Sequence, residues 1–375
     1  MTSSPYVIIG AGFAGAATAY HLARRGAREI VVLEQESVPG VHSSGRNASM
    51  VRQVVPGSAV MNLAGKGAAF LRSLPGDWPT SVSYRQNGSL LLGSGKRWQT
   101  LSRDAERARQ AGIEVELWSP ADAKARVPVL KDADFEGALW CPTDGVVDIH
   151  ALLSGYIKAA FALGARLRYG CSVKGIEVED GRATGVLTAE GTVPAGAVIN
   201  AAGPWAGSVG KMAGAVEAHL HPCRRHLFLT APLGWVDPGW PFVWDDAHGL
   251  YFRPDSGGLL LCPCDEDEMS PGDPPTDNAV AELLAEKVRR YFPGLSDVAI
   301  RKSWAGLRTL STDGRFVIGW DPKVRGFFWV AGLGGHGVTT SSAVGELAAT
   351  LILDPASEKG KDFSPDRLVG LETIV

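Results

Sequence analysis

Three glycines near the N-terminus have the spacing of a dinucleotide-binding turn. They lie in the segment Gly10-Ala11-Gly12-Phe13-Ala14-Gly15, which follows the apolar run Tyr6–Ile9 and precedes the helical run Ala16–Arg25. In such a turn the first glycine permits a tight bend, the second lets the backbone approach a pyrophosphate, and the third lets helix and strand pack closely. The free N–H groups at the start of the helix bind the anion. The residues assigned to this phosphate site are Gly10, Gly12, Phe13, Ala14 and Gly15.

An acidic residue stands where a ribose-binding carboxylate belongs. The apolar run Ile30–Leu33 predicts a second strand, and Glu34 follows it, 19 residues after Gly15. A carboxylate at this point accepts hydrogen bonds from a ribose diol and repels a 2′-phosphate. We therefore assign Glu34 and the adjacent Gln35 to the cofactor site.

Two further glycine-rich segments favour FAD over NAD. Gly40–Ala48 is small and polar, suited to wrapping a second nucleotide half, where an NAD domain continues into a crossover helix. Val330–Thr340 repeats the order of strand, glycine loop and helix before the apolar helix Ala343–Leu353. The start of that helix suits partial negative charge at the flavin N1–C2=O edge. The flavin-binding residues expected in and beside these segments are His42, Ser43, Ser44, Arg46, Asn47, Ala48 and Met50, then Gly334, Gly335, His336, Gly337, Val338 and Thr339.

The composition excludes several other classes of protein. The 375 residues are 45% hydrophobic and 21% charged, which describes a globular chain with a large core. A formal net charge of −3 provides no basic excess for binding nucleic acid. The five cysteines lack the paired spacing of a disulfide framework or a zinc knuckle. No segment other than the glycine-interrupted Tyr6–Leu22 reaches the roughly 18 apolar residues of a membrane span, so we expect a cytoplasmic location and no transmembrane segment.

Helices and strands mix along the chain. Asp148 is an expected N-cap, after which Leu152, Leu153, Tyr156, Ile157, Ala160 and Phe161 share one helical face that we expect to pack on a sheet. Short apolar runs predict further strands at Ser89–Leu92, Ser172–Val178, Ala183–Thr188, Ala197–Asn200, Leu227–Thr230, Leu250–Arg253 and Leu259–Cys262. The predicted class is α/β with an added, mainly antiparallel β region. A Pro/Asp/Glu-rich stretch, Pro263–Asp277, is expected to be a surface loop.

Motifs spread over nearly the whole chain resemble those of one superfamily. They are His42-Ser43-Ser44-Gly45-Arg46, Val198–Trp205, Trp304–Arg308 and Gly326–Ala331. Together they resemble the D-amino-acid oxidase and dehydrogenase superfamily of flavoproteins, and within it the bacterial D-arginine dehydrogenases. The resemblance implies a Rossmann-type, glutathione-reductase-like FAD-binding domain with a second, mainly antiparallel β substrate domain. We expect the first from residues 1–80, 148–215 and 310–375, and the second from 81–147 and 216–309.

The resemblance also implies roles for individual residues. Arg308 matches an arginine that grips the substrate carboxylate, and Arg225 resembles a second carboxylate contact, with Arg224 as its rival. Tyr251 matches a tyrosine that helps hold the carboxylate, and His336 matches a loop residue facing flavin and substrate. These four, Arg308, Tyr251, Arg225 and His336, are the expected catalytic residues. The remaining cofactor contacts implied are Val173, whose backbone meets the adenine, and Ala202, Gly203, Trp205, Gly306 and Arg308.

Three positions depart from the arginine-selective pattern. The acidic residue that reads a substrate guanidinium corresponds to Ser89, with Asn87 nearby; an active-site histidine corresponds to Met50, and a lid tyrosine to about Val55. D-arginine is therefore not the expected substrate.

Flavin chemistry predicts the reaction. A small amino-acid-like substrate, a D-amino acid or an N-substituted glycine, would lose hydride from Cα to flavin N5, and the imino acid would hydrolyse to a 2-oxo acid. A basic, partly desolvated pocket keeps the amine neutral. Oxygen or a quinone would accept the electrons. Two alternatives stay open, namely a 2-hydroxy-acid dehydrogenase and a non-catalytic assembly or binding protein that retains FAD.

Three remaining features bear on the cofactor, on metal binding and on packing. No cysteine lies in Leu307–Thr312 or Gly332–Thr340, where sarcosine-oxidase-like relatives tether FAD, and His42 stands in the His-Ser-x-Gly-Arg run of relatives with unattached cofactor, so we expect non-covalent FAD. His219, His221 and Cys223 make an incomplete metal site, so no metal is expected. The tryptophan-rich stretch Trp235–Trp244 is more typical of packing than of a pocket roof.

Overall fold

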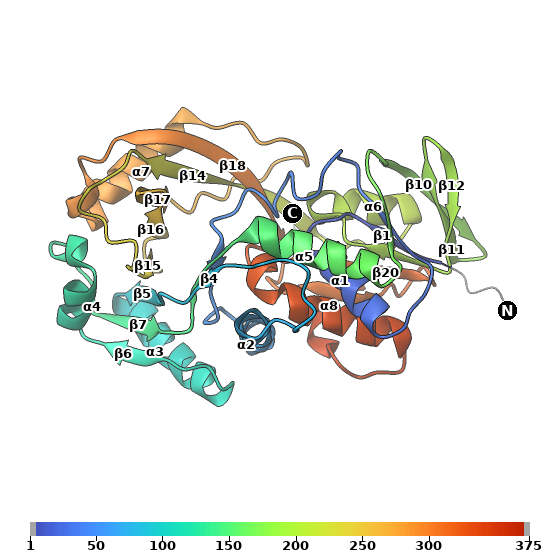
Figure 1. Cartoon of the computed structure of the whole chain (residues 1–375), viewed down its shortest axis with the longest axis horizontal. Coiled ribbons are helices and arrows are strands. Elements are labelled where there is room, and N and C mark those ends of the chain that lie inside the picture. Colours follow the sequence, from blue (N-terminus) through green and yellow to red (C-terminus); the bar gives the residue numbers. More distant parts are fainter. Residues whose placement is uncertain (1–4, 371–375) are drawn as a thin grey trace.

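The computed structural model of the chain describes residues 5–370. Figure 1 shows an elongated molecule, with an eight-stranded sheet toward one end and a six-stranded sheet toward the other. The two longest strands, β14 (Leu220–Thr230) and β18 (Ile300–Ser311), pair antiparallel and run from the first region toward the second. They therefore connect the two halves of the fold.

The six-stranded sheet is parallel except for one edge strand. Its order is β19, β20, β13, β1, β2, β9, and only β19 pairs antiparallel. The strands are β1 (Tyr6–Ile9), β2 (Ile30–Leu33), β9 (Arg166–Arg168), β13 (Ala197–Asn200), β19 (Val317–Trp320) and β20 (Phe327–Ala331). The strands predicted at Tyr6–Ile9, Ile30–Leu33 and Ala197–Asn200 are confirmed with these bounds. β1 lies between β13 and β2, so the carboxyl ends of these strands meet at one edge, where the glycine turn begins.

Four helices pack beside this sheet. They are α1 (Phe13–Arg24), α2 (Ser58–Arg72), α5 (Ile149–Ala162) and α8 (Gly337–Leu353), of which α1 contacts both α5 and α8, and α2 contacts α8. The α1–α8 approach is close, because a Cβ on Gly345 would lie 2.6 Å from the carbonyl carbon of Ala17. The Asp148 N-cap is confirmed, since its Oδ1 accepts hydrogen bonds from the N–H groups of His150 and Ala151.

One part of the α5 prediction is wrong. Leu152, Leu153, Tyr156 and Ala160 are buried as expected, but the Phe161 side chain is 68% exposed. At about 100° per residue, Phe161 lies well outside the stripe that these four residues form. The main contact of α5 is with helix α1.

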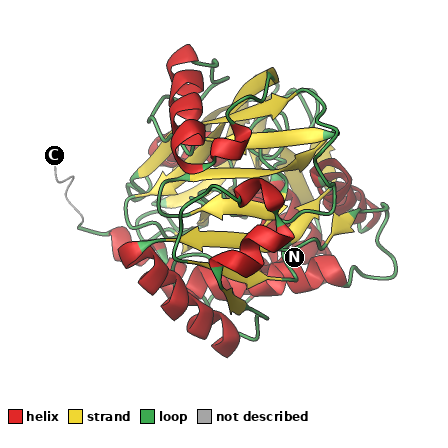
Figure 2. Cartoon of the chain, turned by 90° about the vertical axis from the view of Figure 1, so that its left-hand side faces the viewer, coloured by secondary structure: helices red, strands yellow, loops and turns green. Residues whose placement is uncertain are grey.

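The eight-stranded sheet is mainly antiparallel and forms the other end of the molecule, with strands seen side by side in Figure 2. Its order is β18, β14, β17, β16, β15, β5, β7, β6, and only the β5–β15 pair is parallel. Besides β14 and β18, its strands are β5 (Ser89–Gly93), β6 (Glu116–Trp118), β7 (Gly137–Cys141), β15 (Phe242–Asp245), β16 (Leu250–Asp255) and β17 (Gly258–Cys262). Helices α3 (Gly95–Gln110), α4 (Pro120–Arg126) and α7 (Asn278–Tyr291) accompany it.

Smaller elements complete the described chain. A three-stranded sheet consists of β10 (Val173–Glu179), β11 (Arg182–Thr188) and β12 (Gly191–Pro194), and another of β3 (Met50–Val51), β8 (Gly145–Val147) and β4 (Tyr84–Arg85). Helix α6 (Ala206–Ala213) packs near β10, and short 3-10 helices occur at Pro128–Leu130, Gly203–Trp205, Pro293–Leu295, Lys361–Phe363 and Pro365–Leu368. Within residues 5–370 no helix is long and apolar enough to cross a membrane. The α/β class with an added antiparallel β region is confirmed.

Candidate active site

Two adjoining cavities open where the sheets meet. We name the first the arginine cavity, because Arg46, Arg52, Arg225 and Arg308 line it, and the second the Glu34 cavity, after the acid on its wall. Their walls share Gly12, Ser43, Ser44, Ala201 and Gly203. The loop after the second strand and the glycine turn thus separate the two parts of one extended site.

The N-terminal glycine turn has the close packing that its sequence predicts. Gly10 has φ +101°, a conformation that favours glycine, and a Cβ on Gly15 would lie 1.9 Å from the Gly10 carbonyl oxygen. Gly15 therefore lies behind the turn and lines neither cavity, whereas Gly10 and Gly12 lie on the walls. The first turn of α1 carries no acidic residue, so its N–H groups face the cavities without a competing charge.

Glu34 is held in place by the backbone. Its Oε2 accepts a hydrogen bond from the Ala11 N–H at 2.8 Å, and its Oε1 accepts one from the Glu36 N–H at 3.0 Å. A carboxylate has about four acceptor positions, so this fixed group can still accept hydrogen bonds from a diol in the cavity.

The loop after β2 connects the glycine turn to strand β18. The Ser44 hydroxyl accepts a hydrogen bond from the Phe13 N–H at 3.1 Å, and the Ser43 hydroxyl donates one to the Leu307 carbonyl at 2.6 Å. Asn47 donates from its side-chain amide to the carbonyls of Ser43 and Ser44, which fixes the turn. The loop is thereby attached to the strand that carries Arg308.

Apart from Gly15, every residue assigned to the cofactor or the substrate lines one of the cavities. Residues on the arginine cavity are Gly12, Phe13, Ala14, Ser43, Ser44, Arg46, Asn47, Ala48, Met50, Gly203, Arg225, Tyr251, Gly306, Arg308, Gly334, Gly335, His336, Gly337, Val338 and Thr339. Residues on the Glu34 cavity are Gly10, Gly12, Glu34, Gln35, His42, Ser43, Ser44, Val173, Ala202, Gly203 and Trp205. These segments are far apart in sequence, and the parallel sheet and β18 bring them together.

Arg308 is a cation without a protein partner. It lies on β18, and within residues 5–370 its side chain forms no hydrogen bond or ion pair. Its guanidinium lies against the loop at Gly335, where a Cβ would be 3.0 Å from Cζ. A half-buried guanidinium without a protein partner can bind a ligand carboxylate through two parallel hydrogen bonds, so the geometry fits a carboxylate substrate.

Tyr251 faces the same cavity from β16. It pairs across the strands with Trp244 on β15, with ring centroids 4.6 Å apart, and both rings line the arginine cavity. Burial, together with the neighbouring Cys262 thiol, raises the pKa of Tyr251 well above its ordinary value, although Arg308 opposes the shift. The phenol therefore keeps its proton and can donate a hydrogen bond.

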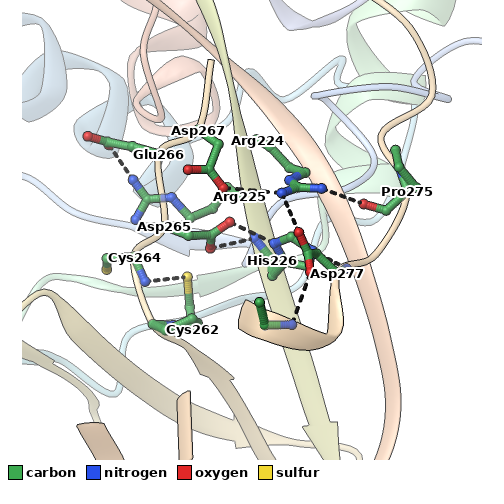
Figure 3. A network of polar contacts seen from close by, with 12 residues as sticks. Arg224, Arg225, His226, Cys262, Cys264, Asp265, Glu266, Asp267, Pro275 and Asp277 are labelled. Carbon is green, nitrogen blue, oxygen red and sulfur yellow. Dashed lines mark hydrogen bonds and ion pairs between the residues drawn. The ribbon is translucent and has the colours of Figure 1, made fainter. Parts of the chain in front are cut away.

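The adjacent arginines of β14 point to opposite sides, as alternation along a strand requires. Arg225 lines the arginine cavity; its Nη2 contacts Glu266, while its buried Nε and Nη1 have no partner within the described chain. Arg224 instead pairs with Asp267 and Asp277 at 3.1 and 3.0 Å (Figure 3). Arg225, and not its rival, is thus on the cavity.

The Pro263–Asp277 segment is a loop, but the prediction of a surface loop is wrong for part of it. Pro263 and Asp265 are buried. Asp265 Oδ1 accepts a hydrogen bond from the backbone N–H of the buried His226 on β14 at 2.9 Å, and Asp265 Oδ2 contacts the Nδ1 of His226 at 2.6 Å (Figure 3). All acidic residues of this segment except Asp273, which contacts Arg46, are partners of basic residues of β14.

His336 is uncharged and lies at the N-terminus of helix α8. It is the N-cap residue of α8 and lines the arginine cavity. Burial lowers the pKa of His336 to about 3, and the nearby charges of Arg52 and Arg308 add to the shift. The first turn of α8 contains no acidic residue, so its free N–H groups face a cavity whose positive charge comes from arginines, beside an uncharged histidine.

Arg52 and Trp244 also line the arginine cavity, although no role was predicted for Arg52 and Trp244 was expected to serve in packing. Arg52 follows β3. The one sequence signal for it is a charged residue within the mainly apolar segment Met50–Val55. Of the tryptophan-rich stretch, only Trp244 lies on the cavity wall, while Trp240 is buried in the core and Trp235 is 48% exposed.

The positions that depart from the arginine-selective pattern lie mostly off the cavity. The Ser89 hydroxyl is fully buried and donates to Asp144 Oδ2 at 2.7 Å, and Val55 is buried in the core. Met50 does line the arginine cavity.

His221 pairs with Glu268, and the described residues contain no group of three or more metal-ligating side chains.

The site fits FAD on its own geometry. The Glu34 cavity offers a fixed carboxylate for a ribose, the start of α1 offers N–H groups for a pyrophosphate, and the arginine cavity is bordered by the start of α8. Both cavities are walled largely by glycine and other small residues, and a Cβ on Gly12 would meet the Ser44 hydroxyl at 2.9 Å. These features match the two halves of a flavin dinucleotide.

Comparison with known proteins gives the same result. The chain is 28% identical to human mitochondrial sarcosine dehydrogenase over 94% of its own length and 40% of that protein, so it spans less than half of this relative. Among solved structures it superposes on L-proline dehydrogenase from P. horikoshii with a TM-score of 0.87 at 25% identity, covering 97% of each chain. It also superposes on iminodiacetate oxidase from Chelativorans sp. BNC1 with a TM-score of 0.77 at 25% identity, covering 93% of this chain and 95% of that one. Residues 5–351 match the family DAO, described as FAD dependent oxidoreductase, and the chain belongs to this family of FAD-dependent oxidoreductases.

Proposed function

We propose that the protein oxidises the Cα–N bond of an amino acid whose carboxylate is bound by Arg308. The observation that carries this proposal is the cation itself: Arg308 lines the arginine cavity, beside the start of α8, with no protein partner among residues 5–370. A planar guanidinium binds a carboxylate through two parallel hydrogen bonds, which also fixes its orientation.

Two further residues complete the proposed carboxylate site. Arg225 has two buried nitrogen atoms without a partner, Nε and Nη1, and Tyr251 has a protonated hydroxyl. Both line the same cavity as Arg308, from strands β14 and β16. A carboxylate held from several sides presents one Cα–H bond in one direction, which is the requirement for a stereospecific hydride transfer.

The charge of the cavity favours a neutral amine. The same Arg52 and Arg308 charges that hold the pKa of His336 down would disfavour an ammonium group on a bound substrate. Only the neutral amine can donate its lone pair as hydride leaves Cα. Bound FAD supplies the hydride acceptor, and the imino acid then reacts with water to give a carbonyl compound and an amine.

The proposed substrate class is an N-substituted amino acid. Sarcosine, proline and iminodiacetate, named in the three similar proteins, are all secondary amines that carry a carboxylate. We also propose that residues 1–80, 148–215 and 310–375 bind FAD and that 81–147 and 216–309 bind the substrate. The electron acceptor, for which oxygen and quinones are the candidates, is open to the same assays.

The experiment is a product analysis with an artificial electron acceptor. The protein is supplied with N-methylated amino acids, primary D- and L-amino acids, and 2-hydroxy acids, and the carbonyl product and released amine are identified. We expect products of C–N cleavage. Turnover of 2-hydroxy acids alone would assign the protein to the alternative 2-hydroxy-acid dehydrogenases, and no turnover of any of them would support a non-catalytic FAD protein.

A further inference from the structure

Arg52 places an additional positive charge on the wall of the arginine cavity. Arg52 is 7% exposed and lines the same cavity as Arg225, Tyr251 and Arg308. The wall of this cavity carries four arginines and, within the described chain, no Asp or Glu. The carboxylates that pair with three of these arginines, Asp273, Asp246 and Glu266, therefore do not line the cavity.

The guanidinium of Arg52 is held rigidly. Its Nε donates to the Val54 carbonyl at 2.8 Å, and its Cζ lies 4.5 Å from the centre of the Trp244 ring. Its backbone N–H donates to the Thr339 hydroxyl at 3.1 Å, which ties it to α8. A guanidinium stacked on an aromatic face keeps its N–H edges free for hydrogen bonds in the ring plane.

The charge of Arg52 is only partly compensated. Its Nη2 is 3.5 Å from Asp246 Oδ1, which is long for a charge-assisted hydrogen bond, while the same Asp246 contacts Arg97 closely through Oδ2. One carboxylate thus serves two guanidinium groups. Within residues 5–370 the Nη1 of Arg52 forms no hydrogen bond, and it is not among the buried atoms without a partner, so solvent or a ligand reaches it.

The two cationic positions are separate. Arg308 comes from β18 and contacts the loop at Gly335, whereas Arg52 comes from the segment after β3 and contacts Trp244. Burial is the main cause of the low pKa of His336, and the charges of both arginines lower it further. A single α-carboxylate on Arg308 would leave Arg52 with only the distant Asp246 carboxylate, which it shares with Arg97.

We propose that Arg52 binds a second carboxylate of the substrate, so that the preferred substrate is an amino dicarboxylate and not an amino acid with an apolar or cationic side chain. This inference rests on the proposed function, which assigns the first carboxylate to Arg308. Repulsion by Arg52 would also disfavour a cationic amino acid such as arginine.

The test measures binding without turnover. Matched non-oxidisable carboxylates of increasing length, propionate, butyrate and valerate against malonate, succinate and glutarate, are titrated into the oxidised holoenzyme, and the flavin absorbance change gives each Kd. At least one dicarboxylate should bind about ten- to hundredfold more tightly than the monocarboxylate of equal carbon number, because one charge-assisted contact has this size. Arg52→Gln should weaken dicarboxylate binding by a larger factor than monocarboxylate binding and so remove that advantage, and Arg52→Lys should retain part of it.

Arg97→Gln is the matched control, because Arg97 shares Asp246 with Arg52 but does not line the cavity. It should retain the preference for dicarboxylates. Equal binding of mono- and dicarboxylates by the wild type would overturn the role proposed for Arg52 and leave the proposed function intact. An equal loss of affinity for both ligand classes in Arg52→Gln would have the same meaning. If no carboxylate of either class binds, the proposed function fails together with this inference.

Discussion

The guanidinium of Arg308 lies directly against Gly335, in the glycine loop that precedes α8. A Cβ added to Gly335 would be 3.0 Å from both Cζ and Nε of Arg308, and Gly335 has φ +148°. A side chain at this position would therefore strain the loop and displace the guanidinium together.

Gly335→Ala should lower kcat/KM for a carboxylate substrate. A misplacement of about 1 Å at a positioning group costs on the order of 100-fold, so we expect a loss of roughly ten- to hundredfold. Steady-state kinetics and the flavin content per chain are the measurements. Gly207→Ala, on the exposed side of α6 with no atom within 4 Å, is the control and should behave as wild type. Unchanged kinetics in Gly335→Ala would show that the loop does not position Arg308.

Arg225→Gln and Arg224→Gln should differ, although the two residues are neighbours on β14. Arg225 lines the arginine cavity and Arg224 pairs with Asp267 and Asp277 behind it. We expect Arg225→Gln to raise KM about tenfold or more, because a charge-assisted carboxylate contact is lost. Arg224→Gln should leave KM near the wild-type value and lower the melting temperature. A larger KM effect at Arg224 would reverse the assignment.

The pH dependence of stability should carry the signature of a histidine that stays neutral when folded. The pKa of His336 is lowered from 6.5 to about 3, first by burial and then by Arg52 and Arg308. The unfolded chain thus takes up this proton more readily, so the stabilisation is present above pH 6.5 and is lost as the pH falls toward 3.

Denaturant unfolding of wild type and His336→Gln, at several pH values from 7.5 down to about 5, measures this effect. The difference in unfolding free energy between the two proteins should be constant above pH 6.5 and shrink below it, since the variant lacks the titrating group. His21, whose burial lowers its pKa to about 4, titrates in the same window but is present in both proteins. A pH-independent difference would mean that folding does not shift the pKa of His336.

FAD should be bound without a covalent bond. His42 lines only the Glu34 cavity, where its Nε2 contacts Glu36 at 2.9 Å and its ring packs edge-on against Trp205 at 4.6 Å. It therefore lies on the nucleotide side of the site, away from Arg308 and Tyr251. After acid precipitation the yellow colour should remain in the supernatant, and fluorescent flavin migrating with the denatured chain would contradict this.

The nucleotide half of the site was predictable because its signals are local. The glycine turn, the strand before it and Glu34 lie within 29 consecutive residues, from Tyr6 to Glu34, and each is recognised by spacing alone. The strand bounds there match the structure, as do the Asp148 N-cap and the end of the C-terminal helix at Leu353. The starts of the two helices were predicted too late, because α1 begins at Phe13 and not at Ala16, and α8 begins at Gly337 and not at Ala343.

The substrate half was less predictable because it depends on tertiary pairing. Nothing in the run around Arg52 indicates that it stacks on Trp244, a residue 192 positions later in the chain. Arg224 and Arg225 could not be distinguished until strand register fixed which side faced the cavity. The acidic segment Pro263–Asp277 was predicted to be solvent-exposed, because composition does not reveal that Asp265 and Glu266 have basic partners on β14. Phe161 continued an apolar pattern in sequence but lies outside the narrow stripe that α1 covers.

Anaerobic reduction of the flavin tests the central claim most directly. Wild type and Arg308→Ala, matched for flavin content, are mixed without oxygen with N-substituted amino acids, including amino dicarboxylates, and the visible flavin absorbance is followed. We predict that at least one of these compounds bleaches the wild-type flavin, and that Arg308→Ala needs about ten- to hundredfold more of it for half-maximal rate. Absence of bleaching by any amino acid, or equal concentration dependence in the two proteins, would contradict the account.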